Sequence, residues 1–148
     1  MLKIISKNAK ETGRIASILA TEVKNLESKK SAVVIALKGN LGAGKTTFVQ
    51  GFARALGIKE NVLSPTFVLL KTYKIKNVRN LKHLTHIDCY RVDSPKELEH
   101  IGFSKMLKDG DAVVLIEWAE KVKNVLPKDT LWIRFNHGAK PSERVINV

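Results

Sequence analysis

The chain has 148 residues, of which 44% are hydrophobic, so we expect one globular domain over 1–148 and exclude a largely disordered chain. Its 26 Lys and Arg against 14 Asp and Glu give a net charge of +12, which favours a polyanionic partner, although a lysine-rich solvated surface would give the same count. The single cysteine, Cys89, excludes an internal disulfide and suits a reducing compartment.

The first 26 residues are predicted to form a short strand and an amphipathic helix. The strand is expected at 2–5, and its apolar run is too short for a signal peptide. Asn8 is predicted to cap the helix, with Glu11 three residues on in a capping-box-like arrangement. The expected apolar face, at helical spacing, consists of Ile15, Ile18, Leu19, Val23 and Leu26. Since no run reaches the ~20 residues of a membrane span, we expect a soluble cytoplasmic protein without a membrane partner.

Two continuous apolar runs, 32–37 and 112–116, predict central strands that are covered on both faces. A glycine-rich turn and a helix over 44–56 follow the first run. Further strands are expected at 66–73, 83–90, 131–135 and 144–148, with a basic loop at 74–82 and a short helix at 95–100. Strands that alternate with helices, together with the strand cluster between 66 and 90, predict an α/β fold with a mixed parallel and antiparallel sheet.

Residues 39–46 match the pattern G-x-x-x-x-G-K-[ST] at every fixed position. Glycines let the backbone N–H groups surround a phosphate, and the helix that follows directs its positive end toward it. Lys45 can reach the terminal phosphates, and Thr46 offers a hydroxyl to Mg²⁺. The nucleotide-binding residues predicted here are Gly39, Gly42, Ala43, Gly44, Lys45, Thr46 and Thr47.

Two carboxylates, Asp88 and Glu117, end apolar strands. Ligands of open α/β sheets bind outside the carboxyl ends of the strands, so both are expected near the terminal phosphate. Either can hold Mg²⁺ or orient an attacking water, and the residues alone leave that choice open. A surface pairing of Asp88 with Arg91 is the simpler alternative. The predicted catalytic residues are Lys45, Asp88 and Glu117, and the predicted metal ligands are Thr46, Asp88 and Glu117.

Several neighbouring side chains allow two interpretations. The hydroxyls of Ser64 and Thr66 flank a proline where a loop can contact the terminal phosphate, but the same residues suit an ordinary turn. Arg91 can stabilise transition-state charge or pair with an acidic neighbour. Trp118 can cover the site or pack in the core.

Ordered blocks between about 33 and 135 resemble the TsaE family, also called YjeE, of bacterial tRNA threonylcarbamoyladenosine synthesis. Residues 39–48 resemble the family's glycine-rich loop, and 64–67 with Tyr73 resemble its S-P-T-F segment with a later tyrosine. Residues 86–92 resemble its H-x-D-L-Y-R-L segment, 97–102 its E-L…G segment, and 116–118 its I-E-W segment. Asn40, Cys89 and Ala119 depart from the usual aspartate, leucine and proline. These departures leave the predicted site residues intact.

The resemblance implies a P-loop NTPase-like three-layer fold that binds ATP and Mg²⁺. It also implies ATP hydrolysis as the accessory component of the complex that forms threonylcarbamoyladenosine beside the anticodon of tRNA. The implied partners are the threonylcarbamoyl-transferase TsaD and its homologue TsaB, with possible electrostatic contact to tRNA. By analogy, Thr46 and Glu117 hold Mg²⁺, Asp88 serves the reacting phosphate or the metal, and Thr12 approaches the nucleotide base.

Two other functions compete with this ATPase. A small-molecule kinase would use Arg91 and the basic stretch 71–82 as a lid, although no separate arginine-rich insertion or acceptor site is evident. A basic nucleic-acid-binding module would use the positive charge, but the chain is only 6% aromatic and no run of aromatics suggests a base-stacking surface. A regulatory GTPase is disfavoured because no N-K-x-D segment is present.

Overall fold

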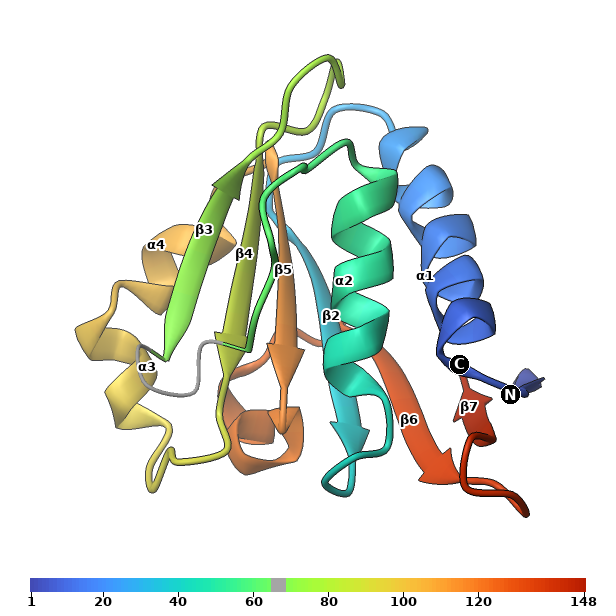
Figure 1. Cartoon of the computed structure of the whole chain (residues 1–148). Coiled ribbons are helices and arrows are strands. Elements are labelled where there is room, and N and C mark those ends of the chain that lie inside the picture. Colours follow the sequence, from blue (N-terminus) through green and yellow to red (C-terminus); the bar gives the residue numbers. More distant parts are fainter. Residues whose placement is uncertain (65–68) are drawn as a thin grey trace.

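The computed structural model describes residues 1–64 and 69–148, so Thr66 and the beginning of the strand predicted at 66–73 lie outside the described residues (Figure 1). Within those ranges the strands form one sheet in the order β1-β7-β6-β2-β5-β4-β3. The strands are β1 (Lys3–Ser6), β2 (Val33–Gly39), β3 (Leu70–Lys74), β4 (His83–Asp88), β5 (Ala112–Glu117), β6 (Leu131–His137) and β7 (Arg144–Asn147).

The centre of the sheet is parallel and its edges are antiparallel. β6, β2, β5 and β4 run in one direction, while β3 pairs antiparallel with β4, β7 with β6, and β1 with β7. The register sets Glu117 opposite both Leu37 and Asp88, so the carboxyl ends of three neighbouring strands meet at one edge. The predicted mixed sheet is therefore confirmed.

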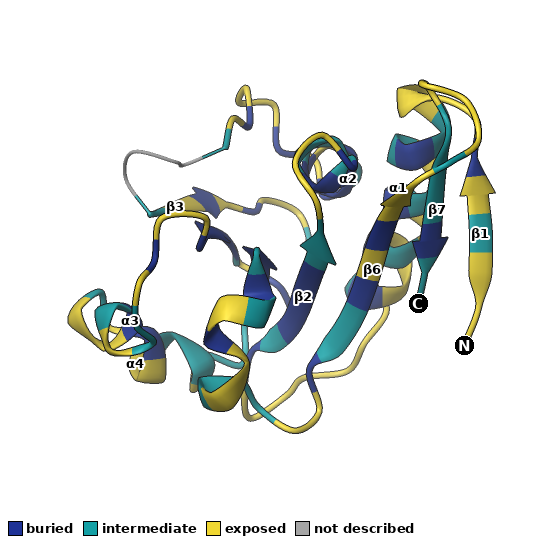
Figure 2. Cartoon of the chain, turned by 90° about the horizontal axis from the view of Figure 1, so that it is seen from below, coloured by how far each residue is buried: buried dark blue, intermediate teal, exposed yellow. Residues whose placement is uncertain are grey.

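Helices cover both faces of the sheet, and the predicted three-layer α/β fold is confirmed (Figures 1 and 2). On one face α1 (Ala9–Lys24) and α2 (Lys45–Ala55) pack over Ile35, Leu37 and Leu115. On the other, α3 (Lys96–His100), α4 (Phe103–Leu107) and the 3-10 helix η1 (Ala119–Val125) pack over alternate strand residues such as Val34 and Val114. Within the described ranges, no helix has the length and apolar character needed to cross a membrane.

The predicted cap of α1 is confirmed, but its predicted apolar face is partly wrong. The Asn8 side chain accepts a hydrogen bond from the Glu11 amide at 3.0 Å, and the Glu11 carboxylate accepts one from the Lys7 amide at 2.7 Å. Ile18 is 65% exposed, whereas the buried positions of the helix are Thr12, Ala16, Ala20 and Val23. Small residues occupy these positions because α1 packs closely against α2.

Four other elements differ from the sequence prediction. Within the described residues, the strand expected at 66–73 begins at Leu70 and extends to Lys74, and β4 ends at Asp88 rather than at Tyr90. Neither α4 nor η1 was predicted.

Candidate functional site at the carboxyl ends of β2, β4 and β5

A cavity of about 380 Å³ lies where β2, β4 and β5 end. It brings together most of the predicted site residues, namely Thr12, Gly42, Ala43, Gly44, Lys45, Thr46, Thr47, Ser64, Asp88 and Glu117. Gly39 does not line the cavity but packs closely against β6, since a Cβ there would meet the Phe135 carbonyl oxygen at 2.6 Å. Arg91 is exposed and is not among the described residues that line the cavity.

The loop 39–46 has backbone angles that favour glycine. Gly42 and Gly44 have φ values of +72° and +101°, a region that residues with a Cβ seldom adopt. Gly44 is also the residue that precedes the first turn of α2, and it has no side chain to cap that turn. The free N–H groups and the positive end of the helix dipole therefore face the cavity, as an anion-binding site requires.

Lys45 is held inside the loop. Its side chain is almost fully buried, and Nζ donates hydrogen bonds to the carbonyl oxygens of Gly39 at 2.5 Å and Asn40 at 3.0 Å. Nζ also lies 4.1 Å from the centroid of the Trp118 ring, which is a cation–π distance. Burial lowers the pKa of Lys45, although the negative charges of Glu117, Glu120 and Asp88 act in the opposite direction.

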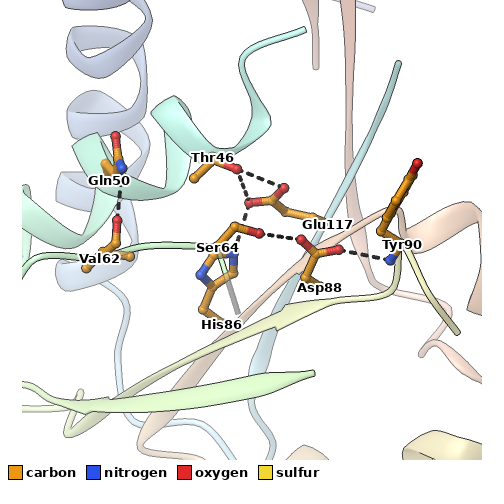
Figure 3. A network of polar contacts seen from close by, with 8 residues as sticks. All are labelled: Thr46, Gln50, Val62, Ser64, His86, Asp88, Tyr90 and Glu117. Atoms are coloured by element: carbon orange, nitrogen blue, oxygen red, sulfur yellow. Dashed lines mark hydrogen bonds and ion pairs between the residues drawn. The ribbon is translucent and has the colours of Figure 1, made fainter. Parts of the chain in front are cut away.

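The Glu117 carboxylate connects Thr46, at the end of the loop 39–46, to His86 on β4 (Figure 3). The Thr46 hydroxyl lies 2.9 Å from Oε1 and 3.1 Å from Oε2 of Glu117, and Nε2 of His86 lies 2.9 Å from Oε1. Glu117 and His86 are both buried. Because a carboxylate only accepts hydrogen bonds, these contacts fix it in one orientation beside Thr46.

Asp88 lies beside Glu117 on the adjacent strand and has a separate set of partners. Its Oδ2 accepts a hydrogen bond from the Ser64 hydroxyl at 2.5 Å, and its Oδ1 accepts one from the Tyr90 amide at 2.9 Å. The segment that carries Ser64 is tied to α2 through a bond of 2.9 Å from the Gln50 side chain to the Val62 carbonyl (Figure 3). The two carboxylates therefore occupy different environments in one cavity.

Hydroxyl and carboxylate oxygens are the ligands that Mg²⁺ prefers. Among the residues that the structure describes, no group of three or more His, Cys, Asp or Glu is arranged to hold a metal. Magnesium in phosphate sites usually takes one or two protein ligands, with water and phosphate as the others. The pair of Thr46 and Glu117 fits that mode, with Asp88 close by.

The structure adds residues to which sequence reasoning assigned no role. Tyr90, Ser142 and Arg144 line the cavity, and Nε of Arg144 donates to the Gly42 carbonyl at 3.2 Å. His86 lies in a segment used for the family resemblance, which was the only signal for it. Arg144 had no signal, because it reaches the loop from β7.

Trp118, left open between cover and core, lies at the cavity. It has a left-handed backbone with φ of +55°, and its ring lies 5.1 Å from the Tyr90 ring. Trp118 follows Glu117 directly in the sequence, and its backbone conformation directs the ring toward Lys45.

The basic stretch 71–82, considered above as a kinase lid, lies elsewhere. Its first residues, Lys71–Lys74, belong to β3, and the loop that follows connects β3 to the start of β4 at the amino end of β4, away from the loop 39–46 (Figure 1). This position disfavours the kinase alternative, in which the stretch would serve as a lid over the phosphates.

The chain is similar to known proteins of one family. A family model described as "Threonylcarbamoyl adenosine biosynthesis protein TsaE" matches residues 6–146. The proteins named tRNA threonylcarbamoyladenosine biosynthesis protein TsaE from Haemophilus influenzae and Rickettsia felis are 36% and 38% identical over 108 and 124 residues. These alignments cover 73% and 83% of this chain, but only 65% and 66% of the relatives, just under two thirds of their length.

A solved structure extends the similarity to the whole arrangement of elements. The crystal structure of Bacillus subtilis YdiB superposes with a TM-score of 0.74 at 33% sequence identity, covering 98% of this chain and 82% of that one. Because the family model spans nearly the entire sequence and the solved relative shares its fold, the chain belongs to the TsaE family.

Proposed function

We propose that the chain is a Mg²⁺-dependent ATPase that serves threonylcarbamoyladenosine formation in tRNA, the process that gives its relatives their name. One observation carries the proposal. A glycine-rich loop that ends in Lys45 and Thr46 lines the same cavity as Glu117, whose carboxylate accepts a hydrogen bond from the Thr46 hydroxyl. In this proposal it acts as the accessory component beside TsaD and TsaB.

The residues divide the work by position. The loop amides and the start of α2 would bind the phosphates, and Lys45 would exchange its carbonyl partners for phosphate oxygens. Thr46 and Glu117 would hold Mg²⁺, which neutralises phosphate charge when bound. Asp88 would accept a hydrogen bond from the attacking water, because Ser64 and the Tyr90 amide hold its carboxylate at the cavity and each of its oxygens keeps a second lone pair. Thr12 and Arg144 would contact the remainder of the nucleotide.

Phosphate release from ATP by the purified chain, with and without TsaD and TsaB, tests the proposal. Lys45→Ala should lower the rate on the order of 10²–10³-fold, because it removes a charged contact made in the transition state. Lys123→Ala, which changes an exposed lysine on η1, is the matched control and should keep the parental rate. Hydrolysis by Lys45→Ala at the parental rate would exclude the site, and rapid transfer to a small acceptor would favour the kinase.

The environments of the two carboxylates predict different defects. Glu117→Gln should raise the Mg²⁺ concentration needed for half-maximal hydrolysis by about tenfold or more, because Glu117 is the carboxylate in contact with Thr46. Asp88→Asn should lower the maximal rate with little change in that concentration. Magnesium titrations of both variants separate the roles, and the reverse pattern would exchange the assignments.

A further inference from the structure

A groove runs along the outer face of the molecule between α1 and α2, which lie side by side and point in the same direction (Figure 1). Its floor consists of small residues at four-residue intervals on each helix: Ala9, Gly13 and Ser17 on α1, and Thr47, Gly51 and Ala55 on α2. The helix backbones approach closely here, since a Cβ added at Gly51 would meet the Gly13 Cα at 2.6 Å. Because the floor is small, the longer side chains beside it form walls.

The walls of this groove are basic. Lys10 and Arg14 line one side and Arg54 the other, around a volume of about 600 Å³. At the carboxyl ends of the helices a second hollow of about 600 Å³ shares Arg54 and Ala55 with the first. The cations of both hollows, here called the basic groove, are Lys10, Arg14, Lys24, Arg54, Lys59, Lys74 and Lys76. From Lys10 to Lys24 the helical rise gives a length of roughly 20 Å.

The positive charge of the basic groove is not compensated by carboxylates of the same chain. Glu60 is the one acidic residue that lines either hollow, and none of the seven cations forms an ion pair within residues 1–64 and 69–148. Six of the seven cations are exposed and Lys24 is half-buried. An uncompensated row of cations in a groove is the arrangement with which proteins follow a nucleic-acid backbone.

The groove lacks the features of a protein interface. None of the exposed large apolar side chains of the described residues, such as Ile18 or Leu41, lines either hollow. Protein interfaces usually have an apolar core with aromatic or arginine anchors in pockets. A floor of small residues between long cations instead lets a narrow charged strand lie close to the helices.

We propose that the basic groove binds the phosphodiester backbone of an RNA strand. The contacts are to phosphates, so they position the RNA without reading its sequence. The groove begins beside the cavity, with which it shares Ala9 and Thr47, and ends about 20 Å away. This surface goes beyond the proposed ATPase and does not depend on hydrolysis.

Binding of a fluorescently labelled, unmodified tRNA transcript to the full chain, measured by anisotropy at several salt concentrations, tests the proposal. The groove variant is Arg14→Gln, Arg54→Gln and Lys59→Gln together. Its control is Lys96→Gln, Lys105→Gln and Lys123→Gln on the opposite face, which also removes three positive charges from exposed positions. The groove variant should bind at least about tenfold more weakly. It should also reduce the slope of log affinity against log salt by about 2, at about 0.7 for each phosphate contact.

The control variant should stay within about twofold of the parent in affinity. Equal losses in both variants would reduce the effect to net charge and overturn the proposal, as would the absence of tRNA binding by the parent at 50 mM salt. Competition by poly-glutamate as effective as that by RNA would assign the groove to an acidic protein instead. Lys45→Ala should bind tRNA like the parent, so a failure of the ATPase proposal is distinguishable from a failure of this one.

Discussion

At the scale of single residues, His86 explains why Glu117 holds one orientation. The imidazole is fully buried, its Nε2 contacts Oε1 of Glu117 at 2.9 Å, and its Nδ1 has no partner among the described residues. Since a carboxylate only accepts hydrogen bonds, Nε2 carries the hydrogen. His86 is therefore a positioning residue whose only polar side-chain contact in the described structure is to Glu117.

Replacing His86 with two different amides separates positioning from packing. The amide nitrogen of His86→Gln reaches about as far as Nε2 and should restore the contact, whereas that of His86→Asn is too short. We expect His86→Asn to raise the Mg²⁺ concentration for half-maximal ATP hydrolysis several-fold and His86→Gln to stay within about twofold, because such outer contacts orient metal ligands. Urea unfolding of both variants serves as the control. Equal Mg²⁺ defects in the two variants would reduce His86 to a packing role.

Most predicted site residues depended on local patterns, whereas the missed Arg144 lies far from them along the chain. The loop 39–46 is contiguous, and Asp88 and Glu117 each end an apolar run, so spacing alone predicted their placement at one edge. Arg144 donates to Gly42 across 102 residues of sequence. No local pattern encodes such a contact, because it depends on which strand closes the edge of the sheet.

At the scale of elements, apolar runs predicted β2 and β5 because both strands are buried on both faces. The five-residue α4 was missed because it is too short for a helical repeat to be visible. The face of α1 was misjudged because large apolar residues were weighed above Ala16 and Ala20, which are buried. The strand order could not be predicted either, because the neighbours of a strand depend on contacts between residues that are distant in sequence.

The crossing of α1 and α2 predicts opposite effects for two glycines. Alanine normally stabilises a helix interior relative to glycine by up to about 1 kcal/mol. At Gly51 an added Cβ would lie 2.6 Å from the Gly13 Cα, so Gly51→Ala should lower the free energy of unfolding by about 1–3 kcal/mol. At Gly13 the nearest atom would be 3.9 Å away, so Gly13→Ala should be neutral or stabilising. Urea denaturation checks both, and equal stability of the two variants would contradict the close approach.

At the scale of the whole molecule, Cys89 is a buried reporter of unfolding. Burial raises its pKa to about 12, with the nearby Asp88 charge adding to the effect and Lys121 opposing it. At pH 8 only about one thiol in 10⁴ is then ionised, and the thiolate is the form that reacts. Because unfolding restores the ordinary pKa, ionisation should also reduce stability progressively as pH rises from 9 toward 12.

Iodoacetamide should therefore modify Cys89 of the native chain only through unfolding. The labelling rate at pH 8 should rise steeply across the urea transition, and Mg²⁺ with ATP should slow it by stabilising the folded state. Protein fully unfolded in urea provides the rate of the exposed thiol. Labelling of the native chain at that rate would show that the strand end around Cys89 opens locally.

The pairing of β1 with β7 joins parts of the chain that are far apart in sequence, since the Leu2 and Val148 amides donate to each other's carbonyls at 3.0 and 2.9 Å. Pairings of such high contact order carry a large loop-closure entropy and are expected late in folding. The strand β2 and helix α2, which flank the phosphate loop, are adjacent in the chain and need no such closure. Folding should therefore shape the phosphate-binding wall of the cavity early and complete the opposite wall, with Thr12 and Arg144, only when the edge strands meet.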